Sequence, residues 1–425
     1  MTNKNAGVLF SIDLMQQIKD RFHYVDFDMR GRRRLFFDNA GGSFRLKAAT
    51  ERHSIIDAIP DCPERIHELA LYLQEVQDRG TQDVRTVLNA PDGTIYASLT
   101  ASGAMFDMVR AIAENVPGEN MVTSVLEHPS SYDAMETYAA RTGKALRVAT
   151  SNPVTGGIDV DNIVGLVDET TCLLSVMYAS NISGAKIDIE EIVARARAIK
   201  PDLFIVVDAV QHAPHGIIDL QKTPVDGINF APYKFFGCRG SGFSWLSPRA
   251  ARLPHNKLAG KAEEFWDLGS PAPSQFAIVT EMVEYVCWLG SQFSDAPDRR
   301  ALFTSGMDRI ALHERALLFQ MLNGSSSVPG LRAIDGVKVF FDHDDFAARD
   351  LILAITFDRL TDTQAVREYE KRGVIVYERV ATSLYSRRML DSFGIEGSVR
   401  VSPLHCNSAE DVNRFLEVTR ELSLL

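Results

Sequence analysis

The stretch Leu203-Phe-Ile-Val-Val-Asp208 is apolar on both faces and ends in a carboxylate. Such a run predicts a buried strand of a parallel sheet, because helices cover both faces of such sheets. Upstream, Cys172-Leu-Leu-Ser-Val-Met-Tyr178 predicts a second buried strand, and residues 189–199 repeat apolar side chains at helical spacing before Pro201. Strand, helix and strand in this order predict a βαβ unit, with Asp208 at the carboxyl edge where open α/β sheets bind ligands.

Short β-branched runs alternate with helical patterns between about residues 90 and 250, which extends the predicted parallel sheet. A smaller α+β unit is expected after the loop Asn323–Gly330. The further elements expected are helices near 276–292 and 304–322, strands near 337–341, 351–357 and 374–377, and a last helix with Ser408 as N-cap. The predicted division is a large domain of residues 30–300 and a small domain of residues 1–29 and 301–425.

Composition narrows the function classes. The chain has 425 residues, 45% apolar and 24% charged, which is typical of a globular protein with a large core. Its net charge is −11, and the best basic cluster, Arg30-Gly31-Arg32-Arg33-Arg34, is too small to offset it, so nucleic acid and anionic membrane are poor partner predictions. No run of eighteen apolar residues predicts a membrane span.

The cysteines favour a reducing compartment. They are an odd number, widely spaced, and form no C-x-x-C pair that would indicate a zinc site or a redox dithiol. The five are Cys62, Cys172, Cys238, Cys287 and Cys406. The apolar patch of residues 6–12 is interrupted by Asp13 before any cleavage site and does not read as a secretion signal. We therefore predict a cytoplasmic protein with no metal site.

One lysine has unusual neighbours, in Ala231-Pro-Tyr-Lys234-Phe-Phe-Gly-Cys-Arg-Gly-Ser-Gly242. A lysine flanked by aromatic rings and partly desolvated has a lowered pKa, as a Schiff-base lysine requires. On this segment alone, a surface lysine beside a glycine hairpin is the favoured interpretation. Asp208 suits a pyridinium nitrogen, which needs an ionised partner, and equally suits a helix cap.

The two features together resemble a known family. Asp208-x-x-Gln211, followed 23 positions later by Lys234, resembles the pyridoxal-phosphate core of the class V aminotransferase and cysteine desulfurase family. Further segments resemble the family's motifs in the family's order. They are Phe37-Asp38-Asn39-Ala40-Gly41-Gly42, Ala101-Ser102-Gly103-Ala104, Glu127-His128-Pro-Ser-Ser131, Ser180-Asn181-Ile-Ser-Gly184, Gly269-Ser270-Pro271 and Val399-Arg400-Val-Ser-Pro403.

The resemblance implies an α/β protein of fold type I: a large domain with a mostly parallel, seven-stranded-type sheet, and a smaller C-terminal α/β domain. It also implies a homodimer and pyridoxal 5'-phosphate as cofactor. The catalytic residues implied are Lys234, His128 and Asp208. The implied cofactor-binding residues are Ser102, Gly103, His128, Asn181, Asp208, Gln211, Tyr233, Lys234 and, on the phosphate of the neighbouring subunit, Ser270. The implied substrate-binding residues are Asn39, Ala40 and Arg400, whose guanidinium suits an amino acid carboxylate.

Several of these residues have a structural alternative. His128 could be a core histidine, Asn181 a turn former and Ser270 a helix cap. Arg400 could belong to an ordinary salt bridge.

The chain also departs from the family's pattern. Desulfurases carry a persulfide-forming cysteine in the loop before the arginine, whereas residues 377–399 contain none, and Thr382 falls nearest to that position. Tyr233 stands where desulfurases commonly have histidine, and the first phosphate turn lacks the family's Thr-Thr. A persulfide-relay desulfurase is therefore disfavoured.

The function expected is that of an enzyme that transforms an amino acid through an external aldimine, in the manner of a class V aminotransferase. The mechanism would begin with an internal aldimine at Lys234, which then removes the α-proton. The alternatives are a C–S β-lyase acting on cysteine or selenocysteine, a desulfurase-like enzyme, and an amino acid epimerase. A non-enzymatic alternative is an idle cofactor-binding protein.

Overall fold

A seven-stranded sheet lies at the centre of the computed structural model, which describes residues 6–425. Its strand order is β2-β8-β7-β6-β5-β3-β4. The strands are β2 (Thr94–Ser98), β3 (Asn120–Ser124), β4 (Ala145–Ala149), β5 (Thr171–Met177), β6 (Phe204–Asp208), β7 (Gly227–Phe230) and β8 (Gly242–Leu246). Strands β3 to β7 pair in parallel, whereas β8 is antiparallel to both of its neighbours. The mostly parallel sheet expected from the sequence is confirmed.

Strand β6 shows why these residues form a central strand. Phe204 and Val206 belong to one hydrophobic cluster, together with side chains of α4 and α5, while Ile205 and Val207 belong to another on the opposite face. Because side chains alternate along a strand, a run that is apolar at every position is stable only with cores on both faces.

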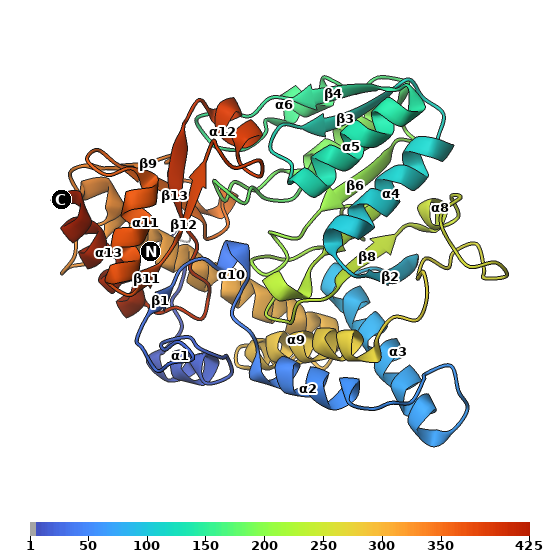
Figure 1. Ribbon diagram of the computed structural model, residues 1–425, viewed down its shortest axis with the longest axis horizontal. Helices are drawn as coiled ribbons and strands as arrows, with labels where there is room; N and C mark the ends of the chain where they lie inside the picture. The colour runs from blue at the N-terminus through green and yellow to red at the C-terminus, as the bar shows by residue number, and fades with distance from the viewer. Residues whose placement is uncertain (1–5) are drawn as a thin grey trace.

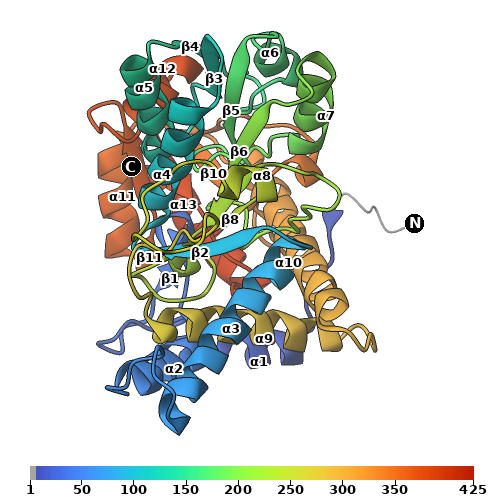
Figure 2. The ribbon, with the colours of Figure 1, turned by 90° about the vertical axis from the view of Figure 1, so that its right-hand side faces the viewer.

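Helices cover both faces and one end of this sheet (Figures 1 and 2). Those in the first three quarters of the chain are α1 (Ile12–Lys19), α2 (Lys47–Asp57), α3 (Glu68–Leu88), α4 (Ala101–Asn115), α5 (Pro129–Thr142), α6 (Val160–Val164), α7 (Ile189–Ile199), α8 (Pro248–Ala251), α9 (Pro273–Ser291) and α10 (Arg299–Asn323). α2 and α3 both pack on α9 at one end of the molecule. The helices expected near 189–199, 276–292 and 304–322 are confirmed as α7, α9 and α10.

The C-terminal elements form a second unit beside the sheet, orange to red in Figure 1. Its four-stranded antiparallel sheet has the order β12-β13-β10-β9. The elements are β9 (Val337–Val339), β10 (Leu353–Phe357), α11 (Asp362–Lys371), β11 (Val374–Ile375), β12 (Tyr377–Val380), α12 (Arg387–Phe393), β13 (Gly397–Val401) and α13 (Ala409–Ser423). Ser408 caps α13 within a capping box, as expected.

The strand expected over residues 374–377 is divided in two. β11 pairs in parallel with β1 (Leu35–Phe36), whereas β12 pairs with β13 in the four-stranded sheet. The side chains of Leu35 and Phe37 accordingly pack in the C-terminal hydrophobic cluster. These contacts do not test the domain boundaries expected from the sequence, which stay a prediction. Among the helices of residues 6–425, none combines the length and the apolar character that crossing a membrane requires.

Candidate active site

The carboxyl ends of the parallel strands meet at one edge of the central sheet, and a cavity of about 310 Å³ lies there. Segments that follow β2, β3, β5, β6 and β7 all contribute to its lining, as the topology of an open α/β sheet requires. Seven of the residues predicted for the site line this cavity together. They are Ser102, His128, Asn181, Asp208, Gln211, Tyr233 and Lys234.

Lys234 is the only lysine among the described residues that line the cavity, and it is buried. It ends a short 3-10 turn, Pro232–Lys234, that begins two residues after β7, and its Nζ lies 3.4 Å from Oε1 of Gln211. Burial lowers the pKa of Lys234 to about 8, and the positive charge of Arg400 acts in the same direction. The amine is therefore available in its neutral, nucleophilic form near physiological pH.

Asp208 is the last residue of β6, and it is buried with few partners. One carboxylate oxygen accepts a hydrogen bond from the backbone N–H of Val210 at 3.0 Å, and the described residues give the other oxygen no partner. Burial raises the pKa of Asp208, while the Val210 N–H and the charge of Lys234 oppose that shift. A cationic group in the cavity would complete its environment.

His128 lies at the start of α5, where its side chain acts as the N-cap. Its Nδ1 accepts from the backbone N–H of Ser130 at 3.2 Å and lies 2.7 Å from the Ser130 hydroxyl. Burial, followed by the charge of Lys234, lowers the pKa of His128 to about 3, so the ring is neutral. A neutral imidazole at this position can stack on an aromatic ligand.

Two further contributors are an amide and a helix N-terminus. The Oδ1 of Asn181 is buried and has no hydrogen-bond partner in the described part of the chain, although the residue lines the cavity. Ser102 lies in the first turn of α4, whose N-cap Thr100 accepts from the N–H of Gly103 at 3.0 Å. The N-terminus of a 15-residue helix facing a cavity favours an anion such as a phosphate.

The residues expected to bind substrate lie beside the cavity and not in its lining. Asn39 is buried, and its amide holds backbone groups of Phe36, Phe44 and Ser402 together. The N–H of Ala40 donates to the Ser402 hydroxyl. These contacts join the N-terminal segment to the end of β13.

Arg400, on β13, is buried and approaches the site from the small sheet. Its Nη2 pairs with Asp38 at 2.7 Å, and its Nη1 donates to the carbonyl of Asn181 at 3.2 Å. Its Nε is buried, and none of the residues 6–425 accepts a hydrogen bond from it. The guanidinium therefore keeps an unused donor beside its pair with Asp38.

Two of the predicted cofactor-binding residues, Gly103 and Ser270, are not among the residues that line the cavity within one chain. Gly103 turns its N–H to Thr100, and Ser270 is exposed and donates to Glu64. Sequence reasoning missed Thr100, Ser130 and Arg239, all of which line the cavity. Thr100 before the Ala-Ser-Gly turn carried an N-cap signal, and Arg239 lay within the quoted lysine segment.

Comparisons with known proteins agree with this fold. A family model described as "Aminotransferase class-V" matches residues 36–415. The chain is 26% identical over 426 residues to probable cysteine desulfurase 2 of Mycobacterium leprae, covering 95% of each chain. It is 28% identical to a probable cysteine desulfurase of Streptomyces coelicolor, covering 75% of this chain and 78% of that one.

Solved structures share the fold at low identity. A NifS-like protein superposes with a TM-score of 0.76 at 19% identity, covering 92% of this chain and 100% of its own. The cysteine desulfurase CsdA of Escherichia coli superposes with a TM-score of 0.78 at 18% identity, covering 98% and 100%.

Fold and cavity together define an α/β enzyme with a buried lysine at the carboxyl edge of its sheet. The chain belongs to the class V aminotransferase family, and it is an enzyme of the transferase or lyase type. The expected family and fold class are confirmed, and enzymes of this family depend on pyridoxal phosphate.

Proposed function

We propose that the chain binds pyridoxal 5'-phosphate in the cavity at the carboxyl edge and transforms an amino acid there. The observation that carries the proposal is Lys234, a buried amine with a pKa of about 8 between Gln211 and the partly satisfied carboxylate of Asp208. Buried lysines are rare in folded proteins. A buried lysine in a cavity that also holds complementary polar groups indicates a functional site.

The groups that the cavity leaves without partners fit this cofactor. The carboxylate of Asp208 suits a protonated pyridine nitrogen, and the side-chain N–H of Asn181, which lines the cavity, would donate to the phenolic oxygen. His128 would cover the ring, with Gln211 and Tyr233 beside Lys234. The N-terminus of α4, with Ser102, would hold the phosphate, whereas the N–H of Gly103 is already bound by Thr100. When bound, the cofactor supplies an electron sink for negative charge that develops at Cα.

The chain's own groups then define the first chemical steps. Arg400 would receive the α-carboxylate of the amino acid at its free Nε, beside its pair with Asp38. Lys234, once displaced by the amino group of the substrate, would remove the α-proton. Asp208 would keep the ring nitrogen protonated throughout.

A second copy of the chain is part of the proposal. Ser270 is exposed and lies outside the cavity of its own chain, which supports a role toward the cofactor phosphate of a neighbouring subunit. Leu99, at the cavity, and Leu268, two residues before Ser270, are exposed large apolar side chains. A homodimer that covers them would remove this apolar surface from water.

A C–S β-lyase is the second candidate, because the curated relatives are named cysteine desulfurases. None of the five cysteines lines the cavity, and the loop of residues 381–386 contains none. A lyase of this kind would therefore act without an enzyme persulfide. Epimerisation stays the third candidate, since it also begins with loss of the α-proton.

Covalent mapping tests the cofactor site. The purified protein should be yellow, and borohydride should fix the cofactor to the peptide that contains Lys234, as mass spectrometry will detect. Lys234→Ala should show no adduct, whereas the matched control Lys222→Ala, at an exposed lysine paired with Glu190, should keep it. An adduct on another lysine, or none in the wild type, rules out the assignment.

Single cysteine replacements distinguish the lyase without a relay from a desulfurase. Replacing each cysteine by serine or alanine should leave turnover of an amino acid unchanged, because a nucleophile must be in contact distance of the substrate to act. Cys238 is the critical position, since it adjoins the lysine segment and is half-buried. A folded, cofactor-bound Cys238→Ser protein that loses desulfuration, with a persulfide on wild-type Cys238, would restore the desulfurase mechanism.

A further inference from the structure

Two arginines of the small sheet share the face that approaches the cavity. Arg400 on β13 lies directly opposite Tyr377 on β12. Arg379 is two residues beyond Tyr377, so it projects from the same face of the sheet and is the diagonal neighbour of Arg400. Arg379 is only 6% exposed.

The partners of these two guanidinium groups differ. Arg400 pairs with Asp38. Among residues 6–425 no carboxylate lies within ion-pair distance of Arg379, whose Nη2 donates to the carbonyl of Tyr385 at 3.2 Å. The Nε of Arg379 is buried and has no partner. A buried cation without a counter-ion is costly to fold, and such groups are usually paired.

Arg379 also lies within electrostatic reach of the reacting groups. Its positive charge contributes to the lowered pKa of Lys234 and, unlike that of Arg400, to that of His128. Burial, followed by the charge of Arg400, lowers the pKa of Arg379 itself to about 9. The charge of Arg379 therefore acts on both Lys234 and His128, whereas that of Arg400 acts on Lys234.

The loop of residues 381–386 connects Arg379 with His128. Tyr385, whose carbonyl holds Arg379, has its ring centroid 6.3 Å from that of His128. This loop, residues 381–386, offers no thiol. At its base the loop contacts a buried cation, Arg379, which is not itself among the residues that line the cavity but lies beside the loop that approaches His128.

We propose that Arg379 binds a second anionic group, carried by the substrate's side chain, and so makes the enzyme selective for amino acids with an acidic side chain. The inference rests on the proposed function, because it takes Lys234 and Arg400 as the sites of the amino group and the α-carboxylate. Arg379 is then a specificity-determining residue whose bidentate edge, Nε included, receives the anion.

Matched pairs of amino acids test this selectivity on the holoenzyme. L-Aspartate and L-asparagine, and L-glutamate and L-glutamine, differ within each pair by one charge at nearly constant shape. Dissociation constants are measured from the change in cofactor absorbance on titration. The wild type should bind the acidic member of one pair roughly 10- to 100-fold more tightly, the effect of one charged hydrogen bond.

Variants assign that preference to Arg379. Arg379→Gln should weaken binding of the acidic amino acid by the same factor and leave the amide unchanged, and Arg379→Lys should retain part of the preference. The control Arg387→Gln changes an exposed arginine of the neighbouring helix α12, which pairs with Asp391, and should change neither constant. Thermal midpoints establish that each variant is folded.

Other outcomes overturn the inference. Equal weakening of acid and amide would mean that Arg379 shares the α-carboxylate, and no effect on either would mean that it only supports the Tyr385 loop. A wild type that prefers neither acidic amino acid, or binds none of the four, contradicts the selectivity directly. Failure of the proposed function is distinguishable, since the wild type would then carry no cofactor on Lys234.

Discussion

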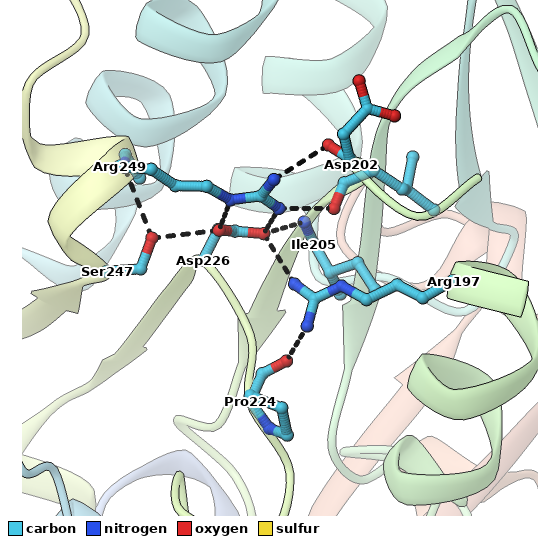
Figure 3. A network of polar contacts seen from close by, with 9 residues as sticks. Arg197, Asp202, Ile205, Pro224, Asp226, Ser247 and Arg249 are labelled. Atoms are coloured by element: carbon cyan, nitrogen blue, oxygen red, sulfur yellow. Dashed lines mark hydrogen bonds and ion pairs between the residues drawn. The ribbon is translucent and has the colours of Figure 1, made fainter.

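Asp208 and Asp226 are two buried aspartates at opposite edges of the same sheet. Asp208 ends β6 at the carboxyl edge, whereas Asp226 precedes β7 at the amino edge. The carboxylate of Asp226 pairs with Arg197 at 2.9 Å and Arg249 at 2.6 Å. It also accepts from the Ser247 hydroxyl and the Ile205 N–H, as Figure 3 shows.

The two sites differ in how completely the protein satisfies the buried charge. Both oxygens of Asp226 are bound within the chain, which ties β6, β7, α7 and α8 together. Asp208 has one backbone hydrogen bond, and residues 6–425 offer its other oxygen no partner. A saturated buried carboxylate stabilises the fold, and an unsaturated one at a cavity is available for a ligand.

The largest effect on folding is expected at the saturated site. Asp226→Ala leaves Arg197 and Arg249 without their counter-ion and should lower the free energy of unfolding by about 3–5 kcal/mol. Chemical denaturation measures this. The control Asp202→Ala removes an exposed carboxylate paired with Lys200 and should cost less than about 1 kcal/mol. An equal loss of unfolding free energy in the two variants would contradict the expected difference between the buried and the exposed carboxylate.

The unsaturated site should show the reverse pattern. Asp208→Ala should lower kcat on the order of 100-fold or more, equivalent to about 2.7 kcal/mol, because a neutral pyridine is a weaker electron sink. Its stability should change little, since only the Val210 N–H loses a partner. Steady-state kinetics and denaturation on the cofactor-loaded variant measure both. Near wild-type kcat with cofactor bound would show that Asp208 is not the ring partner.

The smallest effect is a shift in pH dependence at Lys234, the cation that Asp208 faces. Attack of the lysine on the cofactor aldehyde requires the neutral amine, and a pKa lowered from 10.5 to about 8 means that this form grows as pH rises through 8. The rate at which apoprotein takes up cofactor should therefore rise with a midpoint near pH 8, as stopped-flow absorbance will record. Arg400→Gln should move the midpoint upward by removing a neighbouring positive charge. A midpoint above pH 10 in the wild type would contradict the burial of this amine.

Local sequence was sufficient for the elements that frame the cavity. The buried strand that ends at Asp208 and the helix of residues 189–199 were predictable from local sequence. An apolar run and a helical repeat of apolar side chains both involve residues that are close together in the chain. The last helix was predictable from Ser408, since a cap acts within one turn. The segment of Lys234 taken alone favoured a surface lysine, which is wrong because the structure buries it; only its combination with Asp208 and Gln211 indicated a site lysine.

Other features depend on pairing between distant segments. The sequence did not indicate that residues 374–380 divide between two sheets, because the residues of a strand do not specify which distant strand it pairs with. For the same reason Arg379 could not be told from a surface arginine. Its burial follows from the register of β12 against β13 and from the loop carbonyl of Tyr385.

The sequence by itself determined the central βαβ pattern, the acid at the strand end and the lysine segment, because each is encoded by residues within a few positions of one another. Only the tertiary structure decided which buried charges are satisfied. Asp226 meets Arg197 and Arg249 across 29 and 23 positions, and Arg400 meets Asp38 across 362. Whether a charge finds its partner is fixed by chain packing, and that difference separates the residues that hold this protein together from those available to a substrate.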